Sequence, residues 1–552
     1  MMAYEAVPQA GQAGQEQAGG PGEPPPPGPA TARAMALAAK LSPPLPGGRF
    51  LGWLGPLLIT ALGTFLRFNR LSIPHAIVFD ETYYVGDAYG ILQHGVEINH
   101  VPNADRLLRT GSSTHILGTG GEFVVHPPLG KETIAVGEWL FGLTPFGWRL
   151  MVAILGSLAI LMTARIARRM TRSNLLGCVA GLLLALDGLE FVMSRTALLD
   201  ISVMFWVLAA FGCLLIDRDR SRARLAAAVL RDGERADAAA EAGMRPPPPG
   251  PGPRLGLRWW RVAAGLCLGL AIASKWNGIW FVPVFAVMTL AWDVGARKTA
   301  GFTRPGGQTA RDGLWLPFSF GLVPVAAYLA SWSGWFASPY GYDRNWAAQH
   351  GVHNPIWAAL DSLFQYQLAV LHFSVTLTKA HPYQSWPWSW LVMSRPVSMY
   401  YDGHSHACGV HNCAQEVLAI GTPAIWWASI PALIACVVWW LLRRDWRAGA
   451  VLAGVAAGWL PWFWYAWHDH RTMFFFYAVV FDPFLVIAVT LCLGLIIGPA
   501  RASVGRRAAG AGLAGAYLLA VVADFWYMYP VFAAKIIPYT SWLARMWYHR
   551  WI

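Results

Sequence analysis

Charged residues are scarce in this chain: Asp, Glu, Lys and Arg make up only 13% of its 552 residues. A soluble domain has about 25%, so the composition disfavours an ordinary water-soluble fold. Hydrophobic residues make up 55% of the chain, and apolar runs of about 18 to 22 residues recur along it. An α-helix needs runs of this length to cross a bilayer, which predicts an all-α polytopic membrane protein.

Basic residues are also missing from most long loops, although the net charge is +12. They gather in short loops, at residues 164–172, 443–447 and 501–507, which is an orientation signal and not a nucleic-acid surface. The positive-inside rule makes these loops cytoplasmic. It predicts about eleven spans in the plasma membrane, with the N-terminus cytoplasmic and the C-terminus extracytoplasmic. No internal repeat is evident, which disfavours a transporter.

This sidedness divides the chain into a tail, a first membrane module, a large extracytoplasmic loop and a second membrane module. The predicted regions are, in chain order, residues 1–49, 50–332, 333–424 and 425–552. Within the first module we expect an outer loop over 69–146 and a charged cytoplasmic loop over 217–259. The tail is rich in Pro and Gly and poor in large apolar side chains, so we expect it to be disordered, with an uncleaved signal anchor after it.

Paired CxxC motifs are absent from the seven cysteines. Five cysteines lie in apolar runs and are expected to pack there. Cys408 and Cys413 lie in the large outer loop, where an oxidising environment permits a disulfide. The same stretch, DGHSHACGVHNC, also holds His404, His406 and His411, so metal binding is the alternative.

Two adjacent acids, Asp80 and Glu81, follow the first apolar run in the stretch IVFDETYYVGDAYG. Asp80 could cap an amphipathic interfacial helix, or it could act as a catalytic base at the membrane surface. Glu81 could orient the site, bind an acceptor, or stabilise the first turn of that helix. Asp200 is expected to pair with an arginine, and no role is assigned to Asp482, although acids within a membrane are functional by default.

Six motifs carry a resemblance to a known family. FDETYY, VHPPLGK, GWRLMVAILGS, SRTALLD, SKWNG and SWPWSW occur in the order found in protein O-mannosyltransferases, which the chain resembles from about residue 50 onward. It lacks the inserted MIR module, so it looks like a bacterial member, and its Ala, Gly, Pro and Arg content suggests an actinobacterium. The resemblance implies a GT-C type glycosyltransferase whose extracytoplasmic loops carry the site.

The reaction implied by this resemblance is transfer of mannose from polyprenyl-phosphate-mannose to Ser or Thr hydroxyls of secreted or membrane proteins, with inversion. Expected partners are this lipid donor, the secreted polypeptides and the bilayer, but not nucleic acid. The sequence leaves a Sec translocon partner open. The alternatives are another polyprenyl-phosphate-sugar transferase, acting on lipid or glycan, and a transporter.

Site residues follow from the same resemblance, with Asp80 and Glu81 as the catalytic acids. Cations on the outer side would stabilise the leaving phosphate, so no metal or other cofactor is expected. The residues expected to bind the donor or its phosphate are Arg149, Arg195, Lys275, Arg471, His126 and Lys131. Each cation could instead extend to the membrane interface. An aromatic shelf for sugar or acceptor, with an interfacial belt as the alternative, is predicted at Tyr83, His381, Trp386 and Trp388.

Overall fold

Five helical segments are long and apolar enough to cross a membrane in this computed structural model, which describes residues 27–109, 115–404 and 406–552. They are α6 (Pro145–Thr171), α9 (Asp200–Glu241), η2 with α11 (Trp276–Ala300), α17 (Pro423–Arg443) and α21 (Val504–Phe532). A pair bent by 43°, α12 (Pro305–Gly313) and Pro317–Ser331, would make a sixth. Shorter apolar helices are Gly52–Phe68 of α2 (Arg49–Phe68), α7 (Asn174–Ala185), α10 (Trp259–Ser274) and α20 (Asp482–Ile497). The all-helical membrane class is therefore confirmed, and the count of eleven spans stays a prediction.

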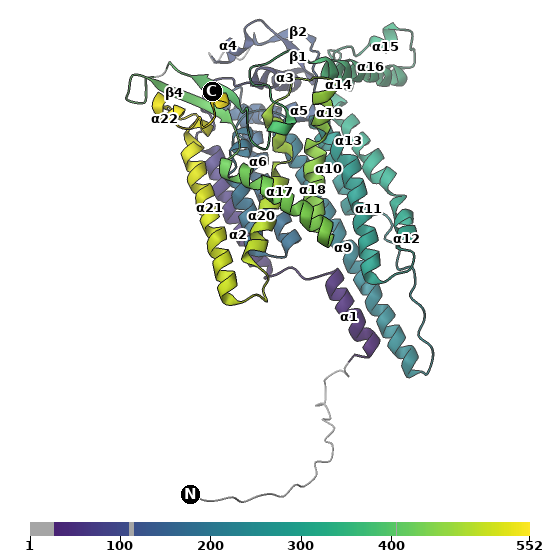
Figure 1. Ribbon diagram of the computed structural model, residues 1–552. Helices are drawn as coiled ribbons and strands as arrows, with labels where there is room; N and C mark the ends of the chain where they lie inside the picture. The colour runs from purple at the N-terminus through teal and green to yellow at the C-terminus, as the bar shows by residue number, and fades with distance from the viewer. Residues whose placement is uncertain (1–26, 110–114, 405) are drawn as a thin grey trace, which may run out of the picture.

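The two loops predicted to lie outside gather at one end of the bundle (Figure 1). The first contains α3 (Glu81–His94), β1 (Ile98–His100), α4 (Ala104–Arg109), β2 (Leu117–Gly121) and α5 (Leu129–Phe141). The second contains α14 (Ser333–Ala337), α15 (Trp346–Gln349), α16 (Pro355–Thr376), η4 (Pro387–Ser389), β3 (Val397–Asp402) and β4 (Cys413–Ala419). Strands β1 and β2 pair antiparallel, and β4 pairs antiparallel with both β3 and β5 (Ile537–Pro538).

Hydropathy predicts one span over about residues 175–193 and two short spans bent at SKWNG, and the structure interrupts the chain at both places. Residues 175–193 form α7 and then α8 (Gly188–Met193), because Asp187 caps the second helix through the backbone amides of Leu189 and Glu190. The apolar stretch around SKWNG ends as α10 at Ser274 and resumes as α11 (Phe281–Ala300), with the 3₁₀ turn η2 (Trp276–Trp280) between them. The break that SKWNG predicts is present, and it leaves Lys275 outside regular helix.

The expected disordered tail needs correction in its second half. Residues 1–26 lie outside the described part, but Pro29–Leu41 form helix α1, which packs on α9 through buried Ala34 and Leu41. The backbone amides of Ala30 and Thr31 donate to the carboxylate of Asp237, which satisfies the first turn of α1. Helix α9 continues to Glu241, so much of the expected loop 217–259 is helical.

The remaining elements lie between and after those described above. They are η3 (Pro317–Leu322), α13 (Val323–Ser331), α18 (Trp446–Trp459), α19 (Pro461–Trp467), η5 (Phe475–Val480), α22 (Tyr539–Leu543) and η6 (His549–Trp551). The largest apolar core lies where α9, α11 and α20 meet: the ring of Phe211 lies 5.8 Å from Phe285 and 5.1 Å from Phe484. At the outer end, Asp200 at the start of α9 and Tyr477 in η5 lie near the start of α3.

Candidate active site

Asp80 stands directly before helix α3, on a turn with unusual backbone geometry. Its carboxylate makes no capping hydrogen bond, so capping does not account for the residue. Phe79, immediately before it, has a φ of 45°, a region costly for a bulky side chain. The rings of Phe474 and Phe476 hold Phe79 in place, with centroids 5.5 and 5.6 Å away. Such strain persists where the surroundings impose it and is typical of functional turns.

Glu81 faces the protein interior and fixes this turn. Its two carboxylate oxygens accept from Arg149 Nε at 2.8 Å and Arg149 Nη2 at 2.9 Å. They also accept from the backbone amides of Val78 and Ala197. Both charged side chains are almost fully buried, and a paired, multiply bonded carboxylate is rigid. Of the roles left open by the sequence, the geometry supports orientation of the site and not contact with an acceptor.

Lys275 and Asp200 form an ion pair whose charges both act on Asp80. Lys275 Nζ lies 3.0 and 2.9 Å from the two oxygens of Asp200 and 4.4 Å from the centroid of the Tyr477 ring. The expectation that Asp200 pairs with an arginine is therefore wrong. Its partner is Lys275, which lies outside regular helix at the SKWNG break. Both residues are buried, which places a fixed cation beside the half-buried Asp80.

The pKa shifts of two residues in the outer loop, Asp80 and His126, show which charged groups act on them. Burial raises the pKa of Asp80 to about 6, although Lys275 works to lower it, and the nearby charge of Asp200 raises it further. Burial lowers the pKa of His126 well below its usual value, and so do the charges of Lys275, Lys131 and Arg471. His126 is therefore neutral and lies among three cations, one of which, Lys275, also acts on Asp80.

Two tyrosines that the sequence did not single out belong to the same group. Burial raises the pKa of Tyr84 well above its usual value, and the charges of Asp80 and Asp200 add to this. The Tyr84 ring lies 6.1 Å from the His126 ring. Tyr84 follows Asp80 by four residues, a spacing that places the two side chains on the same side at the start of α3. The sequence contains this spacing. Tyr477 lies under Lys275 from η5, where no motif marks it.

Arg149, Arg195 and Lys131, three of the six predicted donor-binding residues, bind other protein groups, as Lys275 does with Asp200. Arg149 binds Glu81 and three backbone carbonyls, those of Leu71, Pro74 and Ala76. Arg195 donates to the carbonyls of residues 66, 67, 69 and 70 at the end of α2. Lys131 binds Glu97 and the carbonyl of His126. Arg149 and Arg195 thus hold the loop in place, and donor binding by the six residues stays a prediction. Of the other cations, Lys275 acts on the pKa of both Asp80 and His126, and Arg471 acts on that of His126.

Arg471 keeps a donor available. Its Nε donates to the carbonyl of Ser374 at 2.8 Å, while its buried Nη1 has no hydrogen-bond partner among the described residues. The guanidinium lies 5.7 Å from the centroid of the Trp462 ring. Because Arg471 also acts on His126, it belongs to the same group as Lys275.

Aromatic side chains border the site along η4 and the start of α3. His381 contacts Phe79 edge-on, with centroids 6.0 Å apart, and burial lowers its pKa. Trp386 and Trp388 stack with centroids 5.5 Å apart, and Trp388 stacks in turn on Trp467. Trp388 is 49% exposed and Tyr83 58% exposed. His381 is thus adjacent to the Asp80 turn, whereas Trp388 and Tyr83 present open surface; neither arrangement excludes an interfacial belt.

Asp482, which had no predicted role, lies in a separate buried network. Its neighbours are Asp187, Glu190 and Arg67, and Arg67 forms an ion pair with Glu190. Asp187 accepts from Trp426 Nε1 at 2.8 Å while it caps α8. The network joins the broken span at α8 to α17 and α20, so the geometry favours a structural role.

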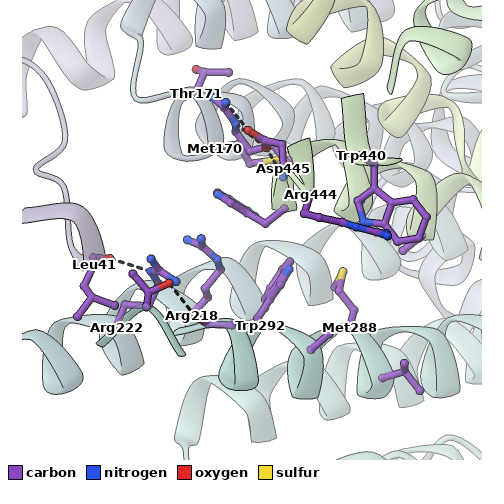
Figure 2. Close-up of a pocket in the computed structure, with 18 of the residues that line it drawn as sticks. Leu41, Met170, Thr171, Arg218, Arg222, Met288, Trp292, Trp440, Arg444 and Asp445 are labelled. Atoms are coloured by element: carbon purple, nitrogen blue, oxygen red, sulfur yellow. Dashed lines mark hydrogen bonds and ion pairs between the residues drawn. The ribbon is translucent and has the colours of Figure 1, made fainter. Parts of the chain in front are cut away.

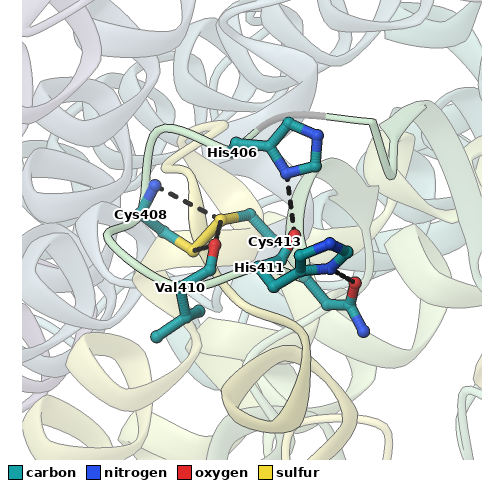
Figure 3. Close-up of a disulfide and its surroundings, with 6 residues drawn as sticks. His406, Cys408, Val410, His411 and Cys413 are labelled. Carbon is teal, nitrogen blue, oxygen red and sulfur yellow. Dashed lines mark hydrogen bonds between the residues drawn. A yellow bond between two sulfur atoms is a disulfide. The ribbon is translucent and has the colours of Figure 1, made fainter.

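Cys408 and Cys413 are joined by a disulfide at the start of β4 (Figure 3). The ring Nδ1 of His406 lies 2.8 Å from the carbonyl oxygen of His411 across the loop. His404 lies beside Asp402, with a separation of 3.4 Å. With both thiols in the disulfide, this stretch cannot offer thiolates to a metal. Asp87, about two turns into α3, belongs to a different group of residues that could hold a metal.

A cavity of about 1080 Å³ lies among the cytoplasmic ends predicted for α9, α11 and α17 (Figure 2). Its lining includes Arg218, Arg222 and Arg444 with Trp292 and Trp440. Among the described residues that line it, none is a predicted site residue. The acid with a raised pKa and the cation beside it, Asp80 and Lys275, do not line this cavity.

Two segments of the chain match known family descriptions. Residues 57–227 match "Dolichyl-phosphate-mannose-protein mannosyltransferase", and residues 359–551 match "C-terminal four TMM region of protein-O-mannosyltransferase". The first contains Asp80, His126 and Asp200, and the second contains Arg471 and Tyr477. Lys275 lies between the two matched segments.

Relatives of known name cover nearly the whole chain. A polyprenol-phosphate-mannose–protein mannosyltransferase of Mycolicibacterium smegmatis is 41% identical, over 92% of this chain and 94% of its own. One of that name from Mycobacterium tuberculosis is 40% identical, over 92% and 93%. Among solved structures, the Saccharomyces cerevisiae Pmt1–Pmt2 protein O-mannosyltransferase complex bound to the sugar donor matches with a TM-score of 0.63. It shares 15% identity, over 94% of each chain, and so shows the fold alone.

Proposed function

The chain belongs to the dolichyl-phosphate-mannose–protein mannosyltransferase family, and we propose that it transfers mannose from polyprenyl-phosphate-mannose to Ser or Thr hydroxyls of proteins. The observation that carries this proposal is Asp80, with a pKa of about 6, beside the Lys275–Asp200 pair. A carboxylate with that pKa is ionised at neutral pH and still basic enough to accept a proton. A general base next to a fixed cation suits attack by a hydroxyl on a sugar phosphate.

The proposed step forms one bond and breaks one. The acceptor oxygen attacks C1 of mannose from the face opposite the phosphate, its proton passes to Asp80, and the bond from C1 to the phosphate oxygen breaks. The configuration at C1 inverts, because no covalent sugar–enzyme intermediate forms. Lys275 and Arg471 would stabilise the charge that develops on the leaving phosphate. Neutral His126, between these cations, would orient the sugar or phosphate by hydrogen bonding.

The remaining features of the proposal concern partners and place. The phosphate would be stabilised by protein cations, so the chemical step is proposed to need no metal or other cofactor. The donor is a lipid, which fits a site at the end of apolar helices, and the acceptors would be secreted or membrane polypeptides reaching that end. A Sec translocon could deliver them. We place the chain in the plasma membrane with the site outside, because its Arg-rich loops lie at the opposite end.

Transfer itself is the first expected result. Detergent-solubilised full-length protein, given labelled polyprenyl-phosphate-mannose and a Thr-rich peptide, should label the peptide. The same peptide with Val in place of Thr should stay unlabelled, because it has the shape but not the hydroxyl. Label that passes only to a lipid or glycan would favour the other sugar transferases. Movement of donor in sealed vesicles, without any transfer in detergent, would favour a transporter.

Orientation is tested separately with a reporter that is active only in the cytoplasm. Fused after Arg169 or after Arg444, it should be active, and fused within Gly403–Gln415 it should be silent. The physical reason is the asymmetric placement of Arg around the spans. Activity of the reporter within Gly403–Gln415 would invert the membrane orientation and place the Asp80 turn in the cytoplasm.

A further inference from the structure

A group of ionisable side chains lies behind the active-site turn, on the far part of α3. Asp87 comes from α3, His100 from β1, Glu122 directly follows β2, and Lys131 comes from α5. The side chains of Asp87, His100 and Glu122 are 4%, 15% and 28% exposed. Three secondary-structure elements therefore bring two carboxylates and an imidazole into one place, away from Asp80.

His100 approaches both carboxylates at a distance that hydrogen bonds do not explain. His100 Nε2 lies 3.6 Å from Asp87 Oδ1 and 3.6 Å from Glu122 Oε2. A hydrogen bond between nitrogen and oxygen measures about 2.7–3.2 Å, and each of these three buried atoms lacks such a partner among the described residues. Tetrahedral ligands bound at about 2.1 Å would lie about 3.4 Å apart. The observed spacing is close to that of ligands around one metal ion.

The charge around this point is unbalanced. Asp87 has three carboxylates in its surroundings, those of Glu97, Glu122 and Glu138, and one lysine, Lys131. Lys131 Nζ lies 2.5 Å from Glu97 but 3.9 Å from Asp87, so Asp87 is not neutralised by a close contact. Both oxygens of Glu138 are buried without a hydrogen-bond partner among the described residues. Uncompensated buried charge is costly, and a divalent cation would offset it.

We propose that Asp87, His100 and Glu122 bind a divalent metal ion of the zinc class through Oδ1, Nε2 and Oε2. The mixed imidazole and carboxylate set favours Zn²⁺ over Mg²⁺ or Ca²⁺, which take oxygen ligands only. Gly86 keeps the place for the imidazole open, because a Cβ there would collide with the His100 ring.

The role of this metal is structural. It ties the β1–β2 hairpin to α3, the helix that begins directly after Asp80, and Lys131 carries the connection on to the backbone of His126. Metal binding at such a site stabilises the folded protein. The metal would not contact the donor phosphate, so the proposed transfer step stays as described above.

The test measures metal content and thermal stability, not activity. Full-length protein purified without a histidine tag and dialysed against trace zinc should hold about one zinc per chain. His100→Gln and Asp87→Asn should lose it, while His94→Gln, an exposed histidine on the same helix, should keep it. Wild-type protein stripped with EDTA should unfold at a lower temperature and recover when Zn²⁺ is added back.

Two results would overturn this proposal. One is wild-type protein that holds no zinc above background and whose unfolding temperature does not respond to Zn²⁺; Asp87 and Glu122 would then share a proton instead. The other is zinc retained in full by both ligand variants, which would place the ion elsewhere. If the ligand variants fail to fold, the stripped wild-type protein still decides the question.

Discussion

Asp80→Asn is expected to lower mannose transfer by at least about 100-fold, the usual contribution of a general base, while the protein still inserts and folds. The amide keeps the shape of the side chain but cannot accept the hydroxyl proton. The measurement is the transfer rate to a Thr-rich peptide at saturating donor, with the unfolding temperature recorded on the same preparation. Asp361→Asn, the same change at a half-buried acid of α16, should transfer at the wild-type rate.

Both the pH profile and the stability follow from the pKa of Asp80. The base works only when ionised, so the rate should fall as pH drops below about 6, and no such limb should remain in Asp80→Asn. The free energy of unfolding should depend on pH in the opposite direction to the rate. Folding raises this pKa from 3.8 to about 6, so the neutral form is favoured in the folded state and the benefit is lost as pH rises through 6. Asp80→Asn should therefore be at least as stable as wild type at pH 7.

A stable, fully active Asp80→Asn protein would remove the base from the mechanism. A protein that loses activity and stability together would return Asp80 to a structural role, despite the missing cap hydrogen bond. These outcomes separate because the uncharged amide should relieve the burial cost that the carboxylate carries at neutral pH.

The sequence shows two adjacent acids after the first apolar run, but it does not show the partners of the cations. The side of the membrane on which these acids lie stays a prediction. Lys275 was recognised because SKWNG interrupts an apolar run, a local signal. Arg149 and Arg195 looked equivalent to it, since all three lie at predicted outer ends of spans. Their difference is tertiary: Arg149 meets Glu81, 68 residues away, and Arg195 meets the carbonyls that end α2. No spacing rule shows whether a cation will meet a ligand or satisfy buried backbone.

Helix boundaries show the same limit. Hydropathy marked residues 175–193 as one span, yet Asp187 ends α7 and caps α8, because its carboxylate prefers exposed amides to an apolar helix interior. The Ala-rich residues after Pro29 contain few large apolar side chains, Met35, Leu37 and Leu41, so composition alone predicts disorder there. They form α1 because α9 extends beside them and offers both an apolar face and Asp237.

Lys275→Gln is expected to lower kcat/KM for the lipid donor by about 100-fold or more, the scale seen when one group that stabilises developing negative charge is removed. The cation lies in a buried site where charge is poorly screened. Acceptor affinity should change much less, because the peptide gives up a proton to Asp80 and carries no phosphate. The measurement is the initial rate against donor concentration at fixed peptide. Lys379→Gln, at an exposed lysine of the second outer loop, is the matched control and should leave the kinetics unchanged.

Asp200 affects how the Lys275→Gln variant is interpreted, and it also provides a second variant that separates two roles of Lys275. Without Lys275 its carboxylate stays buried and unpaired, which destabilises the fold by itself. The double variant Lys275→Gln/Asp200→Asn removes both charges and should restore the unfolding temperature toward wild type. If Lys275 serves the leaving phosphate, the double variant folds but still uses donor poorly. If Lys275 only neutralises Asp200, donor kinetics return together with stability, and Arg471, with its unpartnered Nη1, becomes the remaining candidate for the phosphate.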